Sequence, residues 1–161
     1  MSQRKTSILD KIGMLIPGYK GYAIRDEMRN TDKILRDKLS SLIQQSENNI
    51  IEHQQKLIKN EDMQSCKEWD ISRKALNTLL SKVKLTTYGE SSFFSENQLK
   101  EEELSNIYQY DLEISEKTAI IISKTIESEI NEVLSSITIL KQCKDIDGIL
   151  TERTNYINQF K

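Results

Sequence analysis

Proline and glycine are scarce in this sequence, with one Pro and five Gly among 161 residues. Average usage predicts about eight Pro and eleven Gly in a chain of this length. A β-sandwich or barrel needs many tight turns, which depend on these residues, so the scarcity excludes both architectures and favours a few long helices. Leu, Ile, Val and Phe together make up about 27% of the chain. Because chains below roughly 20% stay disordered, a packed core is expected here.

The residues of several familiar catalytic and metal sites are also missing. A zinc site needs clustered Cys and His, yet the chain has only Cys66, Cys143 and His53, far apart in the sequence. A di-metal carboxylate bundle needs Glu-x-x-His, and Ile50 stands where that Glu should be. No Gly-rich phosphate loop and no Gly-x-Ser-x-Gly segment occurs. We therefore expect no catalytic residue, no metal and no cofactor, and two buried free thiols.

Long hydrophobic runs are absent as well. The isoleucines at 120–122 form one of the longer runs, far short of the roughly 20 apolar residues that a transmembrane helix requires. The first residues lack the apolar stretch and cleavage site of a secretory leader. These features predict a cytoplasmic protein, with peripheral association with a membrane as the alternative.

Charge is nearly balanced overall but is distributed unevenly. The net charge is −2, so no global basic field indicates a nucleic acid, and none is expected as a partner. Residues 1–84 carry 16 basic and 11 acidic side chains, whereas residues 85–161 carry 7 and 14. One interpretation is that the two halves pack together and attract each other. The other is that the first half presents a basic face to an acidic protein partner or an anionic membrane.

Apolar residues recur every three or four positions over most of the chain, which is the spacing of amphipathic helices. From 23 to 59 this spacing runs without a Gly or Pro, and such a helix would be about 55 Å long. Helices of this length are typical of bundles. We predict a single all-α domain, 1–161, an elongated antiparallel three-helix bundle that resembles spectrin repeats. Its expected parts are a short amphipathic helix (6–16), a turn (17–22), three long helices (23–59, 62–84 and 99–144), an aromatic loop (85–98) and a C-terminal helix (147–160).

The two loops are predicted to meet at one end of the bundle. Half of the chain's Gly and Pro residues lie in the segment 17–22, which begins with a Pro-Gly turn signal. The helix at 62–84 is about 20 Å shorter than the one before it, and the segment 85–98 has the length to cover the difference. The side chains expected to form an aromatic cap there are Tyr19, Tyr22, Tyr88, Phe93 and Phe94.

A basic strip follows the first loop. Arg25, Arg29, Lys33 and Arg36 are spaced 4, 4 and 3 residues apart and so share a helix face. The strip is either a solvated surface with ion pairs along the helix or a binding surface for an acidic helix, a phosphate-bearing ligand or anionic lipid. Residues 1–16, which also carry Arg4 and Lys5, either anchor the chain at a membrane interface or form a lid on the bundle.

Four residues on or beside the apolar stripes can be interpreted in two ways. His53 is expected to be a core histidine with a hydrogen bond across the helix seam, with a pH-responsive role as the alternative. Trp69 is expected to anchor the core rather than a ligand site. Asp111 and Arg153 either pair inside the bundle and fix its register or extend to its edge, and the edge position is the more common one.

Both loop regions resemble a known pattern. The segment Ile-Pro-Gly-Tyr-Lys-Gly-Tyr at 16–22, with the charged residues after it, is similar to the family sequence pattern "IPGYxGY…R…R..DK.LR". The segment from Tyr88 through Phe93 and Phe94 to Asp111 is similar to "YGxxxFF…eLxxLYxyD". Together they resemble an uncharacterised family of small prokaryotic helical proteins, which has no assigned enzymatic activity. The resemblance implies that both loops belong to the design of the family. Asn30 departs from the charged residue that the family pattern has there.

The sequence therefore predicts a protein that is not an enzyme and acts as a protein-interaction or scaffold module through an aromatic and basic end. An enzyme at this end would need a deep pocket with perturbed ionisable groups. The alternative function is that of a peripheral membrane protein with residues 1–16 as an interfacial helix. Self-association into a homo-oligomer is a further option. The predicted partner-binding residues are Tyr19, Lys20, Tyr22, Arg25, Arg29, Tyr88, Phe93 and Phe94.

Overall fold

A computed structural model describes residues 7–85, 99–126, 130 and 133–160. Among these residues there is no strand, which confirms the all-α prediction. The short helix α1 (Ile8–Leu15) precedes four long ones. They are α2 (Arg25–Lys59), α3 (Met63–Leu85), α5 (Glu101–Thr125) and α6 (Val133–Asn158).

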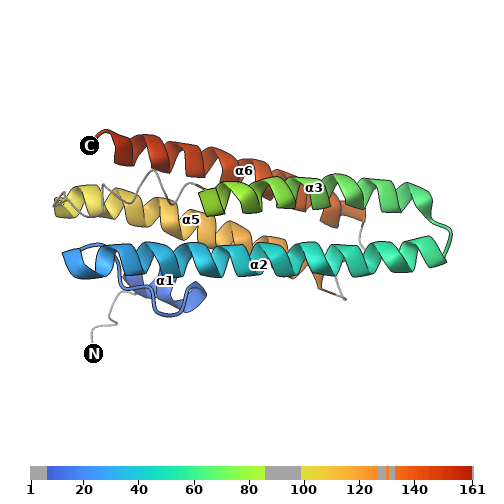
Figure 1. Cartoon of the computed structure of the whole chain (residues 1–161), viewed down its shortest axis with the longest axis horizontal. Coiled ribbons are helices and arrows are strands. Elements are labelled where there is room, and N and C mark those ends of the chain that lie inside the picture. The colour runs from blue at the N-terminus through green and yellow to red at the C-terminus, as the bar shows by residue number, and fades with distance from the viewer. Residues whose placement is uncertain (1–6, 86–98, 127–129, 131–132, 161) are drawn as a thin grey trace, which may run out of the picture.

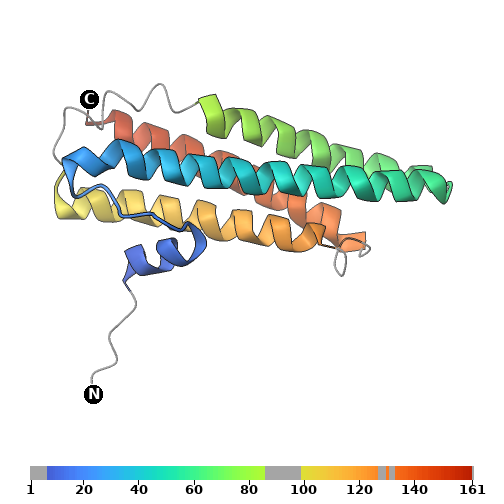
Figure 2. The same ribbon diagram turned by 60° about the horizontal axis from the view of Figure 1, so that its bottom comes forward.

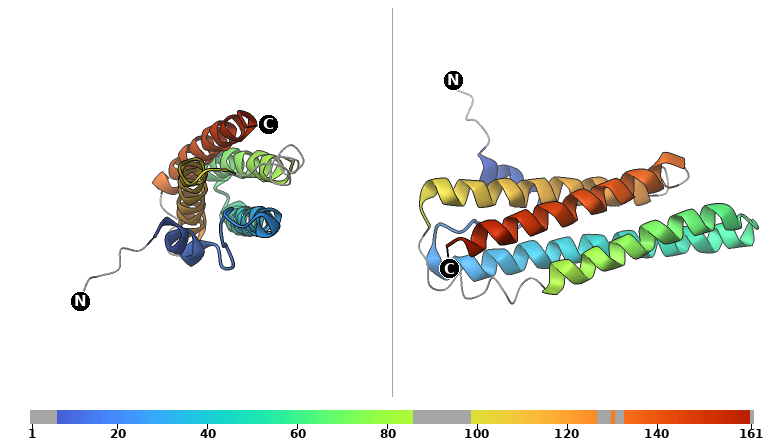
Figure 3. Two further views of the ribbon diagram at one scale, coloured as in Figure 1. Left: turned by 90° about the vertical axis from the view of Figure 1, so that its left-hand side faces the viewer. Right: turned by 90° about the horizontal axis from the view of Figure 1, so that it is seen from above.

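The four long helices form two hairpins that lie side by side (Figure 1). The α2–α3 hairpin packs on the α5–α6 hairpin, with α2 against α5 and α3 against α6. Seen end-on, the four helices surround one core and α1 lies outside them, against α5 (Figure 3). The basic first half of the chain and the acidic second half are therefore in contact, as one interpretation of the charge distribution predicted.

Cross-helix contacts show that neighbouring helices of different hairpins run in the same direction. Asn49 of α2 bonds to Thr125 of α5 at one end, whereas the α2 end that follows Tyr22 lies near the start of α5. On the opposite face, Ser72 of α3 donates to the carbonyl of Ser136 of α6. The α2–α3 hairpin extends beyond the turn between α5 and α6 (Figures 1 and 2).

The predicted number of long helices was wrong. The segment 99–144 is not one helix, because α5 ends at Thr125 and Ile126 has an extended backbone (φ −73°, ψ 157°). The chain reverses after this point, and buried residues of α5 such as Ile114 and Ile121 share the core with Ile139 and Ile146 of α6. The same continuous spacing of apolar residues is compatible with a hairpin of two helices and with one long helix. The periodicity of the sequence therefore could not distinguish the two structures.

The predicted separation of a helix ending at 144 from a C-terminal helix beginning at 147 was also wrong. Residues 145–148 are helical and lie within α6. Gly148 is exposed on this helix, and a Cβ there would meet no atom within 4 Å. A glycine at an open helical position lowers the stability of a helix by only about 1 kcal/mol relative to alanine, which the packing of α6 offsets.

Gly148→Ala is expected to raise the free energy of unfolding by about 0.5–1 kcal/mol, because alanine restricts the unfolded chain and suits the helix interior. Urea unfolding followed by circular dichroism measures this change. A loss of stability on this substitution would contradict the helical assignment of 145–148.

The short helix α1 is a lid on the bundle in this structure. Ser7 and Asp10 form a capping box at its start. Ile12 and Ile16 are fully buried, and α1 packs on α5. The apolar face that an interfacial anchor would need is therefore covered by the protein itself. No described helix has the length and apolar character needed to cross a membrane.

Candidate functional site: a buried tyrosine, aspartate and arginine network

Two glycines turn the segment 17–22 so that its tyrosines enter the bundle. Gly18 and Gly21 have φ values of 91° and 89°, a region that side-chain-bearing residues rarely adopt. The amide of Tyr19 donates to the carbonyl of Ile16, which closes the turn after α1. As a result Tyr19 and Tyr22 are 7% and 2% exposed.

Asp111 of α5 is the centre of the polar contacts at this end. Its Oδ2 accepts hydrogen bonds from the hydroxyls of Tyr19 (2.6 Å) and Tyr22 (2.7 Å). Its Oδ1 accepts one from Nε of Arg153 in α6, at 2.7 Å. Asp111 is completely buried and Arg153 is 1% exposed. This one carboxylate therefore joins the first loop to two helices of the opposite hairpin.

Arg153 continues the network to α2 and α3. Its Nη2 donates to the hydroxyl of Tyr22 (3.1 Å) and to Oδ1 of Asp32 (3.2 Å). Arg36 donates from Nε to Oδ2 of Asp32 at 3.0 Å and from Nη1 to the carbonyl of Val83 at 3.0 Å. Segments from all four long helices and the first loop are therefore tied together by direct hydrogen bonds.

The charges of this network balance within the core. Two buried carboxylates, Asp32 and Asp111, face two buried guanidinium groups, Arg36 and Arg153. Burying an unpaired charge is strongly unfavourable, and a buried pair persists only where further hydrogen bonds satisfy its remaining atoms. Tyrosine hydroxyls and a backbone carbonyl supply those bonds here. Each of the four buried charged side chains therefore has direct hydrogen-bond partners within the core.

A third tyrosine completes the cluster and was not predicted. The hydroxyl of Tyr108 accepts a hydrogen bond from the amide of Tyr22 at 2.9 Å. The rings of Tyr22 and Tyr108 stack with centroids 5.8 Å apart, and Tyr19 meets both edge-on. The aromatic cluster is therefore internal. Its described members are Tyr19, Tyr22 and Tyr108, whereas Tyr88, Phe93 and Phe94 of the predicted cap lie outside the described residues.

Burial and the carboxylate together keep these phenols protonated. Desolvation is the main cause that raises the pKa of Tyr19 well above its usual value near 10, and Asp111 and Tyr22 raise it further. Burial and Asp111 also raise the pKa of Tyr22, although Arg153 opposes them. Burial raises the pKa of Tyr108 as well. The raised pKa values keep all three phenols neutral, so the hydroxyls of Tyr19 and Tyr22 donate to Asp111 while that of Tyr108 accepts from the amide of Tyr22.

The five predicted partner-binding residues that the structure describes separate into two groups. Lys20, Arg25 and Arg29 are exposed, as a binding surface requires. Tyr19 and Tyr22 are not on the surface, because Asp111 holds their hydroxyls inside the bundle. The expectation that they present an aromatic surface was wrong.

One residue of the predicted basic strip, Arg36, is buried and does not belong to the surface. Arg36 is 5% exposed, and its guanidinium is bonded to Asp32 and to the carbonyl of Val83. Lys33 remains exposed. Together with Lys20, the exposed residues of the strip are Arg25, Arg29 and Lys33.

Asp111 and Arg153 pair in the core, so the more common edge position was the wrong choice for both. Asp32 and Tyr108 were missed because their roles appear only when distant segments meet. Helical spacing alone did not show that these side chains meet. The network residues in the segments 16–36 and 88–111 are Tyr19, Tyr22, Asp32, Arg36, Tyr108 and Asp111.

The remaining candidates of the sequence are core residues. Trp69 is 5% exposed, which confirms it as a core anchor, and His53 packs edge-on against its ring at 5.5 Å. Cys66 and Cys143 are both buried free thiols, as predicted, and burial raises the pKa of Cys143 to about 12. Among the residues that the structure describes, no three His, Cys, Asp or Glu side chains gather as metal ligands would.

No family model, no curated protein and no solved structure matches the chain. The residues themselves must therefore support any functional conclusion.

Gly21→Ala is expected to lower the free energy of unfolding by about 2–3 kcal/mol. A Cβ at this position would lie 2.7 Å from the hydroxyl oxygen of Tyr108, and φ at 89° is unfavourable for alanine. Urea unfolding measures the change, and Gly148→Ala is the matched control with the opposite expected sign. A loss below about 1 kcal/mol would contradict the close approach of the turn to Tyr108.

Proposed function

We propose that this protein is a non-enzymatic interaction or scaffold module that binds an acidic partner protein through Lys20, Arg25, Arg29 and Lys33. The observation that carries the proposal is the contrast between these exposed cations and the buried network directly beneath them. The tyrosines hold the turn from inside, while the basic side chains between and after them point outward.

The buried network supports this proposal because it fixes the backbone that carries the cations. Tyr19 and Tyr22 flank Lys20, and their hydroxyls are held by Asp111. Asp32 is held by Arg36 and Arg153, one residue before Lys33. A surface that is already ordered loses less conformational entropy when it binds. Lys20 also pairs with Glu27 at 3.6 Å, a largely exposed contact that contributes little.

A capture experiment from the native cell tests the proposal. Tagged wild-type protein is compared with the double variant Arg25→Glu, Arg29→Glu and with a matched double reversal, Lys67→Glu, Lys141→Glu, at exposed lysines elsewhere. We expect an acidic protein to be recovered by the wild type and the control but not by the first variant, and its recovery to fall as salt increases. Equal recovery by all three chains would refute a binding role for this surface.

The membrane alternative uses the same cations but receives less support. Ile12 of α1 and Ile16, which directly follows this helix, are buried, so association with lipid would rest on charge alone unless α1 left the bundle. Co-sedimentation with vesicles that contain or lack anionic lipid distinguishes the two proposals. Binding to anionic vesicles at low salt, lost in the Arg25→Glu, Arg29→Glu variant, would favour the membrane over a protein partner.

A further inference from the structure

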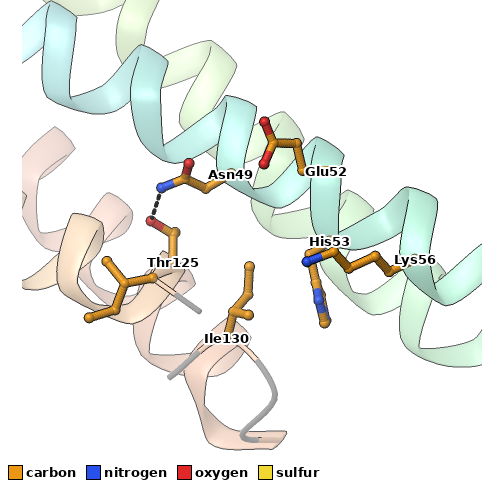
Figure 4. A pocket seen from close by; sticks show the side chains of 7 residues that line it. Asn49, Glu52, His53, Lys56, Thr125 and Ile130 are labelled. Carbon is orange, nitrogen blue, oxygen red and sulfur yellow. Dashed lines mark hydrogen bonds between the residues drawn. The ribbon is translucent and has the colours of Figure 1, made fainter. Parts of the chain in front are cut away.

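A pocket lies at the other end of the bundle, between α2 and the end of α5 (Figure 4). Its volume is about 360 Å3, enough for a small ion with several waters. On the α2 side it is lined by Asn49, Glu52, His53 and Lys56, which come from successive turns of one helix face. Thr125, Ile126 and Ile130 line the opposite side.

His53 forms no hydrogen bond to any residue in the described part of the chain. The residue is 8% exposed and its ring meets Trp69 edge-on. Its ring nitrogens are not fully buried atoms, so they are open to the pocket that the side chain lines. The sequence predicted a hydrogen bond across the seam, but the side chain that lines the other side, Thr125, is bonded to Asn49 and to the carbonyl of Ile122 instead.

Lys56 contributes an exposed ammonium group to the lining of this pocket. Figure 4 shows it beside His53 on the α2 side. Within the described residues it forms no ion pair, in contrast to Lys74, Lys82 and Lys117, which each pair with an aspartate. Asn49 donates to Oγ1 of Thr125 at 3.1 Å, so both of those side chains are already held in place.

We propose that this pocket binds a small oxyanion, a phosphate or carboxylate group, between the Lys56 ammonium and the His53 imidazole. The ammonium supplies a fixed positive charge and the imidazole a second donor. The side chains of Ile126 and Ile130 would meet an apolar portion of the same ligand. Glu52 also lines the pocket, so binding is strongest when His53 is protonated and two cations face one carboxylate.

The electrostatics of the pocket agree with this coupling. Burial, with a smaller contribution from Lys56, lowers the pKa of His53. A bound anion would oppose both causes, because it favours the charged imidazole. Occupancy of the pocket should therefore raise the pKa of His53 and should increase as pH falls through that value.

The chain has a single histidine, so its ring proton gives one unambiguous NMR signal. We would titrate this signal from pH 4.5 to 8.5 in sodium chloride, in sodium sulfate as a phosphate mimic, and in sodium acetate, at matched ionic strength. We expect the pKa of His53 to rise by about half a pH unit or more in at least one of the two oxyanions. A larger effect of sulfate indicates a phosphate-bearing ligand, and a larger effect of acetate a carboxylate.

Two variants distinguish the effect of a bound ion on the pKa of His53 from the effect of ionic screening by the salt. In Lys56→Gln the pKa of His53 should be higher in chloride, because a positive neighbour is gone, and it should no longer respond to the oxyanions. Lys59→Gln removes an exposed lysine that does not line the pocket and should respond as the wild type does. The same pKa in all three salts, or an equal response in Lys56→Gln, would overturn the proposal.

Discussion

Asp111→Ala is expected to lower the free energy of unfolding by about 3–5 kcal/mol, because it leaves the guanidinium of Arg153 buried with only part of its compensation. Arg153 would keep its contact to Asp32, but that carboxylate already accepts from Arg36. The hydroxyls of Tyr19 and Tyr22 would also lose their acceptor, and each unsatisfied donor adds about 1–3 kcal/mol before relaxation. The loss is large compared with the 5–15 kcal/mol that stabilises a typical domain.

The matched control is Asp147→Ala. Asp147 also pairs with a cation, Lys82, at 2.6 Å, but its side chain is 60% exposed. An exposed pair contributes about 0–1 kcal/mol, so this variant should unfold at nearly the wild-type urea concentration. Equilibrium unfolding followed by Trp69 fluorescence measures both. Similar losses for the two variants would mean that burial of the Asp111 network does not determine its contribution.

Stability is expected to fall steeply above pH 10. The unfolded chain loses phenolic protons near pH 10, whereas the folded chain retains them on Tyr19 and Tyr22, whose pKa values are raised. The stabilisation that these groups provide is therefore fully present below pH 10 and is lost as pH rises. Each such tyrosine removes about 1.4 kcal/mol of unfolding free energy per pH unit, so two of them remove about 5 kcal/mol by pH 12.

Urea unfolding between pH 9 and 11.5 measures this slope. Tyr19→Phe should reduce it by about 1.4 kcal/mol per pH unit, even though the variant is less stable at neutral pH. Tyr156→Phe serves as the control, because the hydroxyl of Tyr156 lies in an exposed contact with Asn106, and it should leave the slope unchanged. A native protein whose tyrosines all ionise near pH 10 while it stays folded would contradict the buried network.

Helix spacing in the sequence was sufficient to predict the all-α class and the helices that became α1, α2 and α3. It could not place the reversal after Thr125, because no Gly or Pro marks it and the apolar stripe continues on both sides. The predicted separation between the helices 99–144 and 147–160, in the region of Gly148, was wrong for the opposite reason. A single glycine at an exposed helical position lowers stability only slightly, and the packing of α6 determines the outcome.

The candidate site was found only in part, and the reason is geometric. The glycines at 18 and 21 indicated a specific turn, but only their positive φ values determine that Tyr19 and Tyr22 face inward. The partners of Asp111 lie 92, 89 and 42 residues away in the sequence. Contacts at such separations depend on how the helices are arranged in space. The incorrect three-helix arrangement did not bring the helix that carries Arg153 next to Asp111.

The central claim is that Asp111 and Arg153 act as one buried pair that holds this end of the bundle together. A double-mutant cycle with Asp111→Leu and Arg153→Met tests it directly, with the free energy of unfolding as the measured quantity. Each single variant leaves a buried group without its partner, and the double variant removes both. We predict that the double variant is more stable than the sum of the single losses implies, by about 2–3 kcal/mol. Losses that add to within about 0.5 kcal/mol would contradict the claim.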